Sequence, residues 1–348
     1  MASDPKDPDL KAPGPEGPAL KAPGVEGPAR KAPGVEETGL KTPGVEEPGL
    51  NAPGVEEPDV KAPGLKAPGV KDPDLQAPAP KDAHFDADQV DAYLRRIGAK
   101  RPAGPTADAL RTLHLAHLRT VPFENLSIHL GEEIMLAEQP LFDKVVGESR
   151  GGFCYELNGV FGALLTALGF EVTLLQARVF GEGRRVGIPY DHLALLVRTA
   201  DGDDWLADVG FGAHSHYPLV FGERGEQADP GGRFRIAEAD SGHGDLDVLR
   251  DGEPQYRLEM RPRALGDFTA GAWWHSTSPQ SNFTRSLVCS RITEDGGRIT
   301  LSGRTFTVTD AHGVKKTSTC GTDEETLVVY RERFGILLEE VPGVREAM

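Results

Sequence analysis

The sequence predicts an α+β fold in which helices come first and a barrel of short strands follows. Apolar residues recur at helical spacing between residues 86 and 169. From residue 171 onwards the period changes, and short apolar runs alternate with turns that contain Gly, Pro and Asp. A mixed segment of strands and a helix follows the strand-rich part. This succession is typical of α+β proteins, and the length of the strand-rich part favours a barrel.

Three amphipathic helices are predicted in the first part, over residues 86–98, 106–121 and 154–169. Asp86 or Asp88 can cap the first helix, and a glycine ends the first and the third. The second stops before a proline, because the residue that precedes a proline disfavours helical geometry. The apolar residues of these helices are Val90, Tyr93, Leu94 and Ile97, then Leu110, Leu113, Leu115 and Leu118, then Leu157, Val160, Phe161, Leu164, Leu165 and Leu168.

Short apolar runs bounded by turn residues predict the strands. The segment 199–204, Thr-Ala-Asp-Gly-Asp-Asp, has the composition of a hairpin connection, so the strands on either side of it should pair. A second hairpin is expected around Asp310–Gly313, and a last helix begins near Asp323. The predicted strands are 172–180, 193–197, 204–209, 233–236, 255–260, 286–292, 298–301, 305–309 and 315–319.

A ten-residue repeat dominates residues 1–82. Lys21–Arg30, Lys31–Leu40 and Lys41–Leu50 show it, each with Pro-Gly near its start and acidic residues after it. Its single apolar positions are too sparse to bury a core and offset the entropy of ordering the chain. We therefore expect a disordered tail that acts as a charged, solubilising spacer, with a docking tail for a partner as the alternative.

Composition restricts the classes of function. A formal net charge of −16 argues against a nucleic-acid partner. The three cysteines are far apart, so neither a metal site nor a disulfide framework is expected. The polar start lacks a secretory signal, which together with the odd cysteine count favours a reduced, cytoplasmic setting. No apolar stretch reaches the length that spans a bilayer, so no membrane partner is expected, and the oligomeric state stays open.

The segment 150–159, Arg-Gly-Gly-Phe-Cys-Tyr-Glu-Leu-Asn-Gly, places Cys154 at the start of a predicted helix. A helix N-terminus offers partial positive charge and free N–H groups, and both favour a thiolate. An isolated cysteine is more often a buried residue without a catalytic role. Here the two preceding glycines allow a close approach to the helix start, which favours a nucleophile.

His192 and Asp208 are the candidate partners of the thiol. His192 opens an apolar strand, where a histidine is more often structural. Asp208 lies between apolar residues of a predicted strand, where a carboxylate is costly unless a partner satisfies it. Pairing across the hairpin would bring Asp208 beside His192, and the two could activate Cys154 as a nucleophile. The competing imidazoles are His114, His117, His214 and His216.

From about Phe85 onwards the chain resembles the arylamine N-acetyltransferases. Several independent motifs carry the resemblance, and they occur in the family's order, with the family's spacing between Cys, His and Asp. The repeat tail lies outside it, and the stretch 222–251 is also unusual in its Gly, Asp and Glu content. The matching segments are 121–126 (Val-Pro-Phe-Glu-Asn-Leu), 150–154, Asn158-Gly159, His192, 208–212 (Asp-Val-Gly-Phe-Gly) and 277–284 (Thr-Ser-Pro-Gln-Ser-Asn-Phe-Thr).

The resemblance implies a helical bundle that carries the cysteine, a β-barrel that carries His and Asp, and an α/β lid. It also implies a catalytic core like that of the cysteine proteases. Together with the element pattern, it divides the chain into the tail 1–82, a helical domain 83–169, a barrel domain 170–290 and a lid domain 291–348.

The family's reaction implies ping-pong acetyl transfer. Cys154 would take the acetyl group from acetyl-CoA, His192 would act as base and acid, and Asp208 would hold His192. An arylamine, arylhydrazine or N-hydroxyarylamine would then accept the acetyl group. The resemblance also places Phe123 and Phe211 in the acceptor pocket, Gly212, Trp274, Gln280, Asn282 and Phe283 at CoA or substrate contacts, and Glu124 and Arg150 in an ion pair that braces the cysteine helix.

Three alternatives remain open at this point. The same constellation could serve an amide synthase that passes a polyketide acyl chain to an aromatic amine. It could also serve a transglutaminase-like or hydrolytic Cys–His–Asp enzyme. A non-catalytic scaffold is the third, and the intact Cys, His and Asp argue against it.

Overall fold

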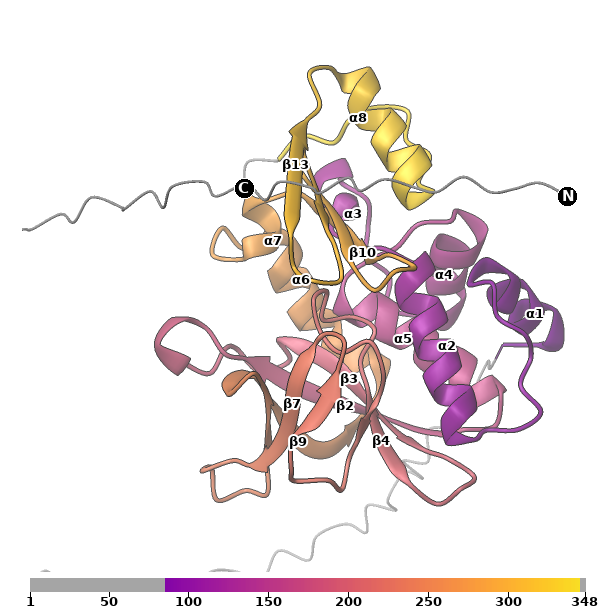
Figure 1. Cartoon of the computed structure of the whole chain (residues 1–348), viewed down its shortest axis with the longest axis vertical. Coiled ribbons are helices and arrows are strands. Elements are labelled where there is room, and N and C mark those ends of the chain that lie inside the picture. Colours follow the sequence, from indigo (N-terminus) through magenta and orange to yellow (C-terminus); the bar gives the residue numbers. More distant parts are fainter. Residues whose placement is uncertain (1–84, 345–348) are drawn as a thin grey trace, which may run out of the picture. The chain divides into compact units, whose positions relative to one another are not determined.

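Helices come first in the part of the chain described by the computed structural model, residues 85–344 (Figure 1). Helix α1 (Ala87–Arg96) is capped by Asp86, which accepts the N–H of Gln89 at 2.8 Å, while the Gln89 side chain accepts the N–H of Asp86. This reciprocal pair is a capping box, so Asp86 and not Asp88 is the cap. The predicted disordered tail lies outside the described residues.

Helix α2 (Ala107–Thr120) differs from the prediction in the face that it buries. Leu115 is only half-buried, whereas His114 and His117 are fully buried. The buried positions 110, 113, 114, 117 and 118 follow the i, i+3, i+4, i+7, i+8 stripe of one helix face, and position 115 lies off it. Each ring has at least one partner, because the Tyr93 hydroxyl lies 2.9 Å from His117 Nδ1 and the carbonyl oxygen of His216 lies 3.0 Å from His114 Nδ1.

The stretch between α2 and the cysteine helix α5 (Cys154–Ala167) holds short elements that the sequence pattern does not predict. They are too short to show a period, and the strand among them has only two residues. They are β1 (Phe123–Glu124), α3 (Leu126–Leu130), α4 (Glu138–Phe142) and a π-helical turn (Asp143–Gly147).

The larger sheet has eight antiparallel strands in the order β5-β4-β3-β2-β9-β8-β7-β6, and it is nearly closed into a barrel. The side chain of Gln227 on the edge strand β6 bonds both the N–H and the carbonyl oxygen of Val220 on the other edge strand, β5. The strands are β2 (Glu171–Val179), β3 (His192–Arg198), β4 (Asp204–Ala207), β5 (Leu219–Val220), β6 (Gln227–Asp229), β7 (Gly232–Glu238), β8 (Leu246–Arg250) and β9 (Glu253–Arg263).

The predicted hairpin between β3 and β4 is present, with Leu195 opposite Ala207. Strand β4 ends at Ala207, two residues earlier than predicted, so Asp208 is the first residue after the strand. The backbone leaves the ladder there because the N–H of Asp208 donates to His114 Nε2 at 3.2 Å and not to a neighbouring strand.

A second sheet has five strands in the order β1-β10-β11-β12-β13. Strand β1 comes from the helical part of the chain and pairs with β10, so that Glu124 lies opposite Cys289. The predicted strands at 298–301, 305–309 and 315–319 and the helix near Asp323 are all present. The elements are β10 (Val288–Ile292), β11 (Arg298–Ser302), β12 (Thr305–Thr309), β13 (Lys315–Thr319) and α8 (Asp323–Val329).

Two further helices connect the sheets, α6 (Thr269–Thr277) and α7 (Asn282–Arg285). They occupy the region between β9 and β10, where the sequence predicts no element. The largest apolar core packs α1, α2 and α5 with residues of β3, including Leu193 and Leu195. None of the described helices has the length and apolar character needed to cross a membrane. The domain limits at 169 and 290 stay predictions.

Candidate active site

Cys154 is the first residue of α5, and its position depends on close backbone contacts at two glycines. A β-carbon at Gly151 would lie 1.8 Å from the carbonyl oxygen of Pro122. A β-carbon at Gly210 would lie 2.7 Å from the Cα of Cys154. Only glycine therefore fits at either position. The start of α5 thus packs between Pro122, just before β1, and the loop after Asp208.

The structure brings Cys154, His192 and Asp208 together. His192 Nε2 lies 2.8 Å from Asp208 Oδ2, and both side chains are buried. The other ring nitrogen, Nδ1, is left for Cys154, which interacts electrostatically with His192. The chain of contacts has the order nucleophile, base and orienting carboxylate that a nucleophilic triad requires.

Asp208 is held by more donors than His192 alone. Its Oδ1 accepts from the side-chain amide of Asn158 at 2.9 Å and from the N–H of Gly210 at 3.0 Å. Asn158 also donates to the carbonyl of Leu193, and its oxygen accepts the N–H of Val209. The carboxylate is therefore fixed in position on both oxygens, which fixes the His192 ring in turn.

These contacts set the charges of the pair. Burial alone would lower the pKa of His192, but the charge of Asp208 and the hydrogen bond to it raise the pKa to about 10. Burial would raise the pKa of Asp208, but the charge and hydrogen bond of His192 hold it well below its usual value. At neutral pH the structure therefore favours an imidazolium paired with a carboxylate.

The pKa of the Cys154 thiol differs from the expectation, which was a thiolate favoured by the helix N-terminus. Burial raises the pKa of Cys154, and the hydrogen bond and charge of His192 work against that rise. The thiolate is consequently available only through His192, because a desolvated sulfur cannot hold a negative charge without a positive partner.

Asn158 and Tyr256 are two site residues to which the sequence analysis assigned no role. Asn158 has a signal that could have revealed it, because it follows Cys154 by four residues and so lies on the same helix face. Tyr256 has none, since it is one residue of a long strand. Its ring lies 5.2 Å from the His192 ring, and its buried hydroxyl makes no regular hydrogen bond with the described residues. Burial and then the charge of Asp208 raise the pKa of this phenol well above its usual value.

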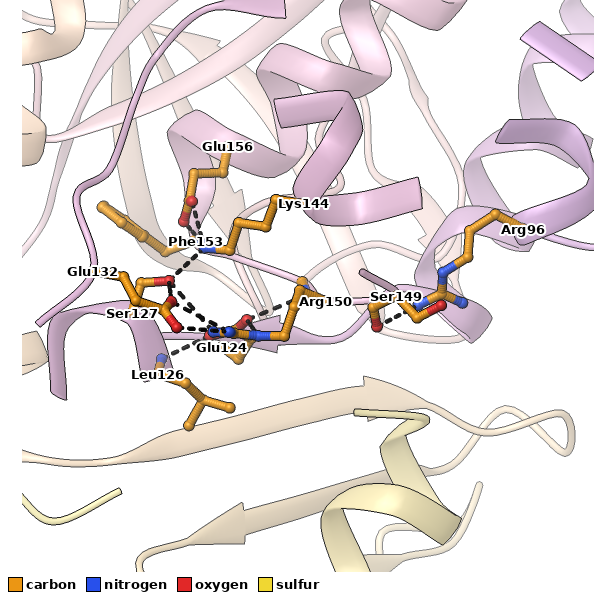
Figure 2. A network of polar contacts seen from close by, with 11 residues as sticks. Arg96, Glu124, Leu126, Ser127, Glu132, Lys144, Ser149, Arg150, Phe153 and Glu156 are labelled. Atoms are coloured by element: carbon orange, nitrogen blue, oxygen red, sulfur yellow. Dashed lines mark hydrogen bonds and ion pairs between the residues drawn. The ribbon is translucent and has the colours of Figure 1, made fainter. Parts of the chain in front are cut away.

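Glu124 and Arg150 form the ion pair that the resemblance implies, at 3.0 Å and in a buried position (Figure 2). Glu124 Oε1 also accepts the N–H of Gly151, which precedes the cysteine helix. Burial opposes the charge of Arg150, but Glu124 and Glu132 together raise its pKa above the usual value. The pair thus ties β1 to the segment that enters α5.

Figure 2 also shows a second buried pair, Lys144 and Glu156, at 2.6 Å. Glu156 Oε2 accepts the N–H of Phe153, the residue just before Cys154. Glu156 therefore caps the N-terminus of the cysteine helix from its third position. Lys144 compensates the buried carboxylate, and it also donates to the Ser127 hydroxyl. Two ion pairs, Lys144–Glu156 and Arg150–Glu124, thus fix the start of α5.

A cavity of about 840 Å³ opens above the triad. Cys154 and His192 line it, whereas Asp208 lies behind His192 and does not. Gly212 does not line it either; its φ of +86° explains the glycine there, and its carbonyl accepts from Arg298. The other expected contact residues all line the cavity: Phe123, Phe211, Trp274, Gln280, Asn282 and Phe283.

Asn125 holds one wall of this cavity in place. Its side-chain amide donates to the carbonyls of Phe283 and Ser286, and its oxygen accepts the N–H of Val288. Ser281 caps the short helix α7 through the N–H of Phe283 at 3.1 Å. The motifs 121–126 and 277–284 are therefore connected in space, which places Phe123 and Phe283 with ring centroids 6.0 Å apart.

Three buried histidines around the site should make the protein acid-sensitive. Burial lowers the pKa of His114 and of His214 to about 4, and that of His117 well below its usual value. The unfolded chain binds these protons near pH 6.5, so stability should fall as the pH drops from 6.5 to 4. The loss should be about 3 kcal/mol for each histidine with a pKa of about 4.

Urea unfolding at a series of pH values between 4 and 7 measures this effect. The slope of stability against pH should become shallower in His114→Gln, whereas the exposed His243→Gln should keep the parent slope. An unchanged slope in His114→Gln would contradict the assignment.

The comparisons with known proteins agree with this geometry. A sequence model of the N-acetyltransferase family matches residues 106–342. The chain is 34% identical over 265 residues to the arylamine N-acetyltransferase / N-hydroxyarylamine O-acetyltransferase of Salmonella typhimurium, which covers 74% of this chain and 92% of that protein. The chain belongs to the arylamine N-acetyltransferase family. The resemblance predicted from the motifs is thus confirmed.

Other family members are similar over the same region. Human arylamine N-acetyltransferase 1 is 32% identical over 277 residues, covering 72% of this chain and 94% of that protein. The solved structure of the Salmonella typhimurium protein has a TM-score of 0.68 at 31% identity and covers 76% of this chain and 96% of that one. The Mycobacterium marinum arylamine N-acetyltransferase in complex with CoA has a TM-score of 0.64 at 30% identity and covers 71% and 92%. Neither the amide synthase nor the transglutaminase-like alternative is favoured by these findings.

Proposed function

We propose that this protein transfers an acetyl group from acetyl-CoA to an arylamine, an arylhydrazine or an N-hydroxyarylamine. One observation carries the proposal: Cys154 and His192 line a single cavity with aromatic walls, and Asp208 holds the far nitrogen of His192 at 2.8 Å. An acyl group on the sulfur would therefore face a flat, apolar space that suits an aromatic acceptor.

In the first half-reaction, the Cys154 sulfur attacks the acetyl carbonyl carbon of acetyl-CoA. The bond between that carbon and the CoA sulfur then breaks, and His192 gives its proton to the departing sulfur. The first N–H groups of α5 have no carbonyl partner within the helix, so they are our candidates for stabilising the oxyanion. The product is an acetyl thioester on Cys154 and a neutral His192.

In the second half-reaction, the amine nitrogen attacks the thioester carbon. His192 takes the proton of the amine, and the bond between carbon and the Cys154 sulfur breaks. The thiolate and the imidazolium are restored together. Asp208 stabilises the positive charge on His192 in both steps and keeps Nδ1 directed at the sulfur.

The remaining residues of the cavity divide into two groups. We infer that Phe123 and Phe211 form the walls around the acceptor, because Phe211 lies edge-on to the His192 ring at 5.1 Å. Trp274, Gln280, Asn282 and Phe283 line the cavity from the α6–α7 side and would contact CoA. Arg185, in the segment 181–187 between β2 and β3, also lines it and could pair with a CoA phosphate.

We also propose a division of the fold into a lid, a catalytic core and a spacer. We interpret the five-stranded sheet with α8 as the predicted lid domain and the α5 region with the near-closed sheet as a core like that of the cysteine proteases. The nucleophile lies at the start of helix α5 and the base lies on strand β3, and this arrangement supports a core like that of the cysteine proteases. The N-terminal repeat would act as a charged spacer.

Intact-mass measurement tests the function most directly. The full chain incubated with acetyl-CoA alone should gain the mass of one acetyl group, and peptide mapping should place it on Cys154. Addition of an arylamine should remove that mass and yield the acetylated amine. A panel of arylamines, hydrazines and N-hydroxyarylamines would then rank the acceptors. A chain that stays unmodified while its thiol is free would refute the proposal.

A further inference from the structure

A second cavity, of about 500 Å³, lies between the eight-stranded and the five-stranded sheets. It shares no lining residue with the cavity that holds Cys154. Its walls come from the loop after Asp208, from β8 and from β11 to β13. We call it the anion cavity, and the residues that matter to the argument are His214, Arg250, Arg298, Asp310 and Lys315.

Three cationic side chains from three strands line the anion cavity. Arg298 on β11 donates to the carbonyl of Gly212 at 2.7 Å and to the Ser290 hydroxyl at 3.0 Å, and no carboxylate pairs with it among the described residues. Burial and then the charge of Arg250 lower the pKa of Arg298 to about 10. The guanidinium therefore carries a positive charge that its surroundings do not compensate.

Arg250 on β8 has a carboxylate partner at long range. It donates to the carbonyl of Ala213 at 3.0 Å, and its Nε forms an ion pair with Asp251 at 3.7 Å. Burial lowers the pKa of His216, another residue of the cavity wall, and the charges of Arg298 and Arg250 lower it further. Each guanidinium has five N–H groups, and the contacts named here use only some of them. Both arginines thus keep donors for a further acceptor.

The acidic residues near the cavity bind backbone groups. Among the described residues, Asp310 is the acidic residue that lines the anion cavity. Its Oδ1 accepts the N–H groups of His312 and Val314. Asp229, behind the wall, accepts the N–H groups of His216 and Gly231. These carboxylates are occupied by the turns that they stabilise, so they do not pair with either arginine.

His214 has an unsatisfied polar atom. The residue is 4% exposed and lines the anion cavity, and its Nε2 is buried without a hydrogen-bond partner. Its Nδ1 lies 3.3 Å from the Ser215 hydroxyl. Because Nε2 has almost no accessible surface and the ring packs against Phe211, Phe234 and Tyr256, a ligand in the cavity does not reach this atom, and the cations alone supply the binding groups.

We propose that the anion cavity binds a phosphate group, held by Arg250, Arg298 and Lys315. A tetrahedral phosphate offers several acceptor oxygens in different directions, which suits cations that approach from three strands. The group could belong to CoA itself or to a separate phosphate ester. His214 also packs on Phe211 with ring centroids 5.0 Å apart, so the phosphate would lie one ring behind the wall of the active-site cavity.

Isothermal titration of the full chain with inorganic phosphate, at constant ionic strength, tests the proposal. We expect Arg250→Gln, Arg298→Gln and Lys315→Gln each to weaken phosphate binding, by about tenfold or more for each arginine. Lys315 is exposed, so its substitution should not disturb folding. Arg233→Gln on β7 is the matched control, because Arg233 is exposed, pairs with Glu226 and lies outside the anion cavity. Its affinity for phosphate should equal that of the parent.

Two further measurements distinguish the sources of the phosphate. If it belongs to CoA, Arg250→Gln should raise KM for acetyl-CoA but not for acetyl-pantetheine, which has no phosphate, and inorganic phosphate should compete with acetyl-CoA. If it belongs to a separate ester, KM for acetyl-CoA should stay at the parent value while phosphate affinity falls. Both results support the proposal.

Equal phosphate affinity in the parent and in all three cavity variants would overturn it, as would no binding at millimolar phosphate. Titration of Cys154→Ala gives the same information without acetyl transfer, so failure of the anion site is separable from failure of the proposed function.

Discussion

Replacing Cys154 with alanine should abolish acetyl transfer, with a loss of kcat/KM of about four orders of magnitude or more. In the proposed reaction the sulfur carries the acetyl group between the two half-reactions, and no other cysteine lines the cavity among the described residues. Without the sulfur, an amine would have to attack acetyl-CoA directly in a site arranged for two successive displacements. Loss of the covalent intermediate should therefore remove both steps.

The chain provides matched controls for this experiment. Cys289 and Cys320 are also buried and free, and neither lines the active-site cavity. Cys289→Ala and Cys320→Ala should keep both the transfer rate and the acetyl adduct in intact-mass spectra. If Cys154→Ala transferred acetyl as fast as these controls, the assignment of the nucleophile would be wrong.

The triad could be predicted from the sequence because its members lie at points where local patterns change. Cys154 stands where a Gly-Gly pair meets a helical period, and His192 stands where an apolar strand begins. Asp208 was predicted within a strand, although it is the first residue after one. The error arose because Val209 continues the apolar pattern, while the backbone N–H of Asp208 bonds to His114 from a distant helix.

The contacts that complete the site could not be predicted, because they join residues far apart in the chain. Strand β1 has only two residues and pairs with β10, so that Phe123 lies opposite Ser290. Pairing of β2 with β9 brings Tyr256 beside Val179 and so toward the His192 ring. Neither pairing has a turn or a period that marks it in the sequence. Only the family motifs implied that residues 121–126 and 277–284 belong to the same site.

Replacing Asp208 with asparagine should lower kcat by about three to four orders of magnitude while the fold persists. Asp208 accepts from three donors, namely His192, Asn158 and Gly210. An asparagine side chain has one acceptor oxygen and one NH₂ group. The NH₂ group would therefore point as a donor either at the side chain of Asn158 or at the His192 ring. Facing His192, it would force Nε2 to accept and would place the proton on Nδ1. The base would then lack the lone pair that receives the proton of Cys154 or of the amine.

The charges should change in the same variant. The pKa of His192 is about 10 because the charge and hydrogen bond of Asp208 outweigh burial. Without the carboxylate, burial is opposed only by Cys154, so the pKa should fall from about 10 toward its ordinary value near 6.5 or below, and the ring should be mostly neutral at pH 7. Cys154 then loses the positive partner that opposes its burial, and its own pKa should rise further. Alkylation of Cys154 at pH 7 should slow by about tenfold or more.

The pH dependence of stability is an independent test of the His192–Asp208 ion pair. In the parent, a folded-state pKa of about 10 lies above the unfolded value near 6.5, so the folded chain holds the His192 proton more tightly. The stabilisation is complete below pH 6.5 and should be lost as the pH rises toward 10. In Asp208→Asn this decline should disappear. Asp204→Asn is the matched control, because Asp204 opens β4, the strand that precedes Asp208, and pairs with Arg198 at the surface. Urea unfolding between pH 6 and 10 measures both, and parallel curves for the parent and Asp208→Asn would contradict the ion pair.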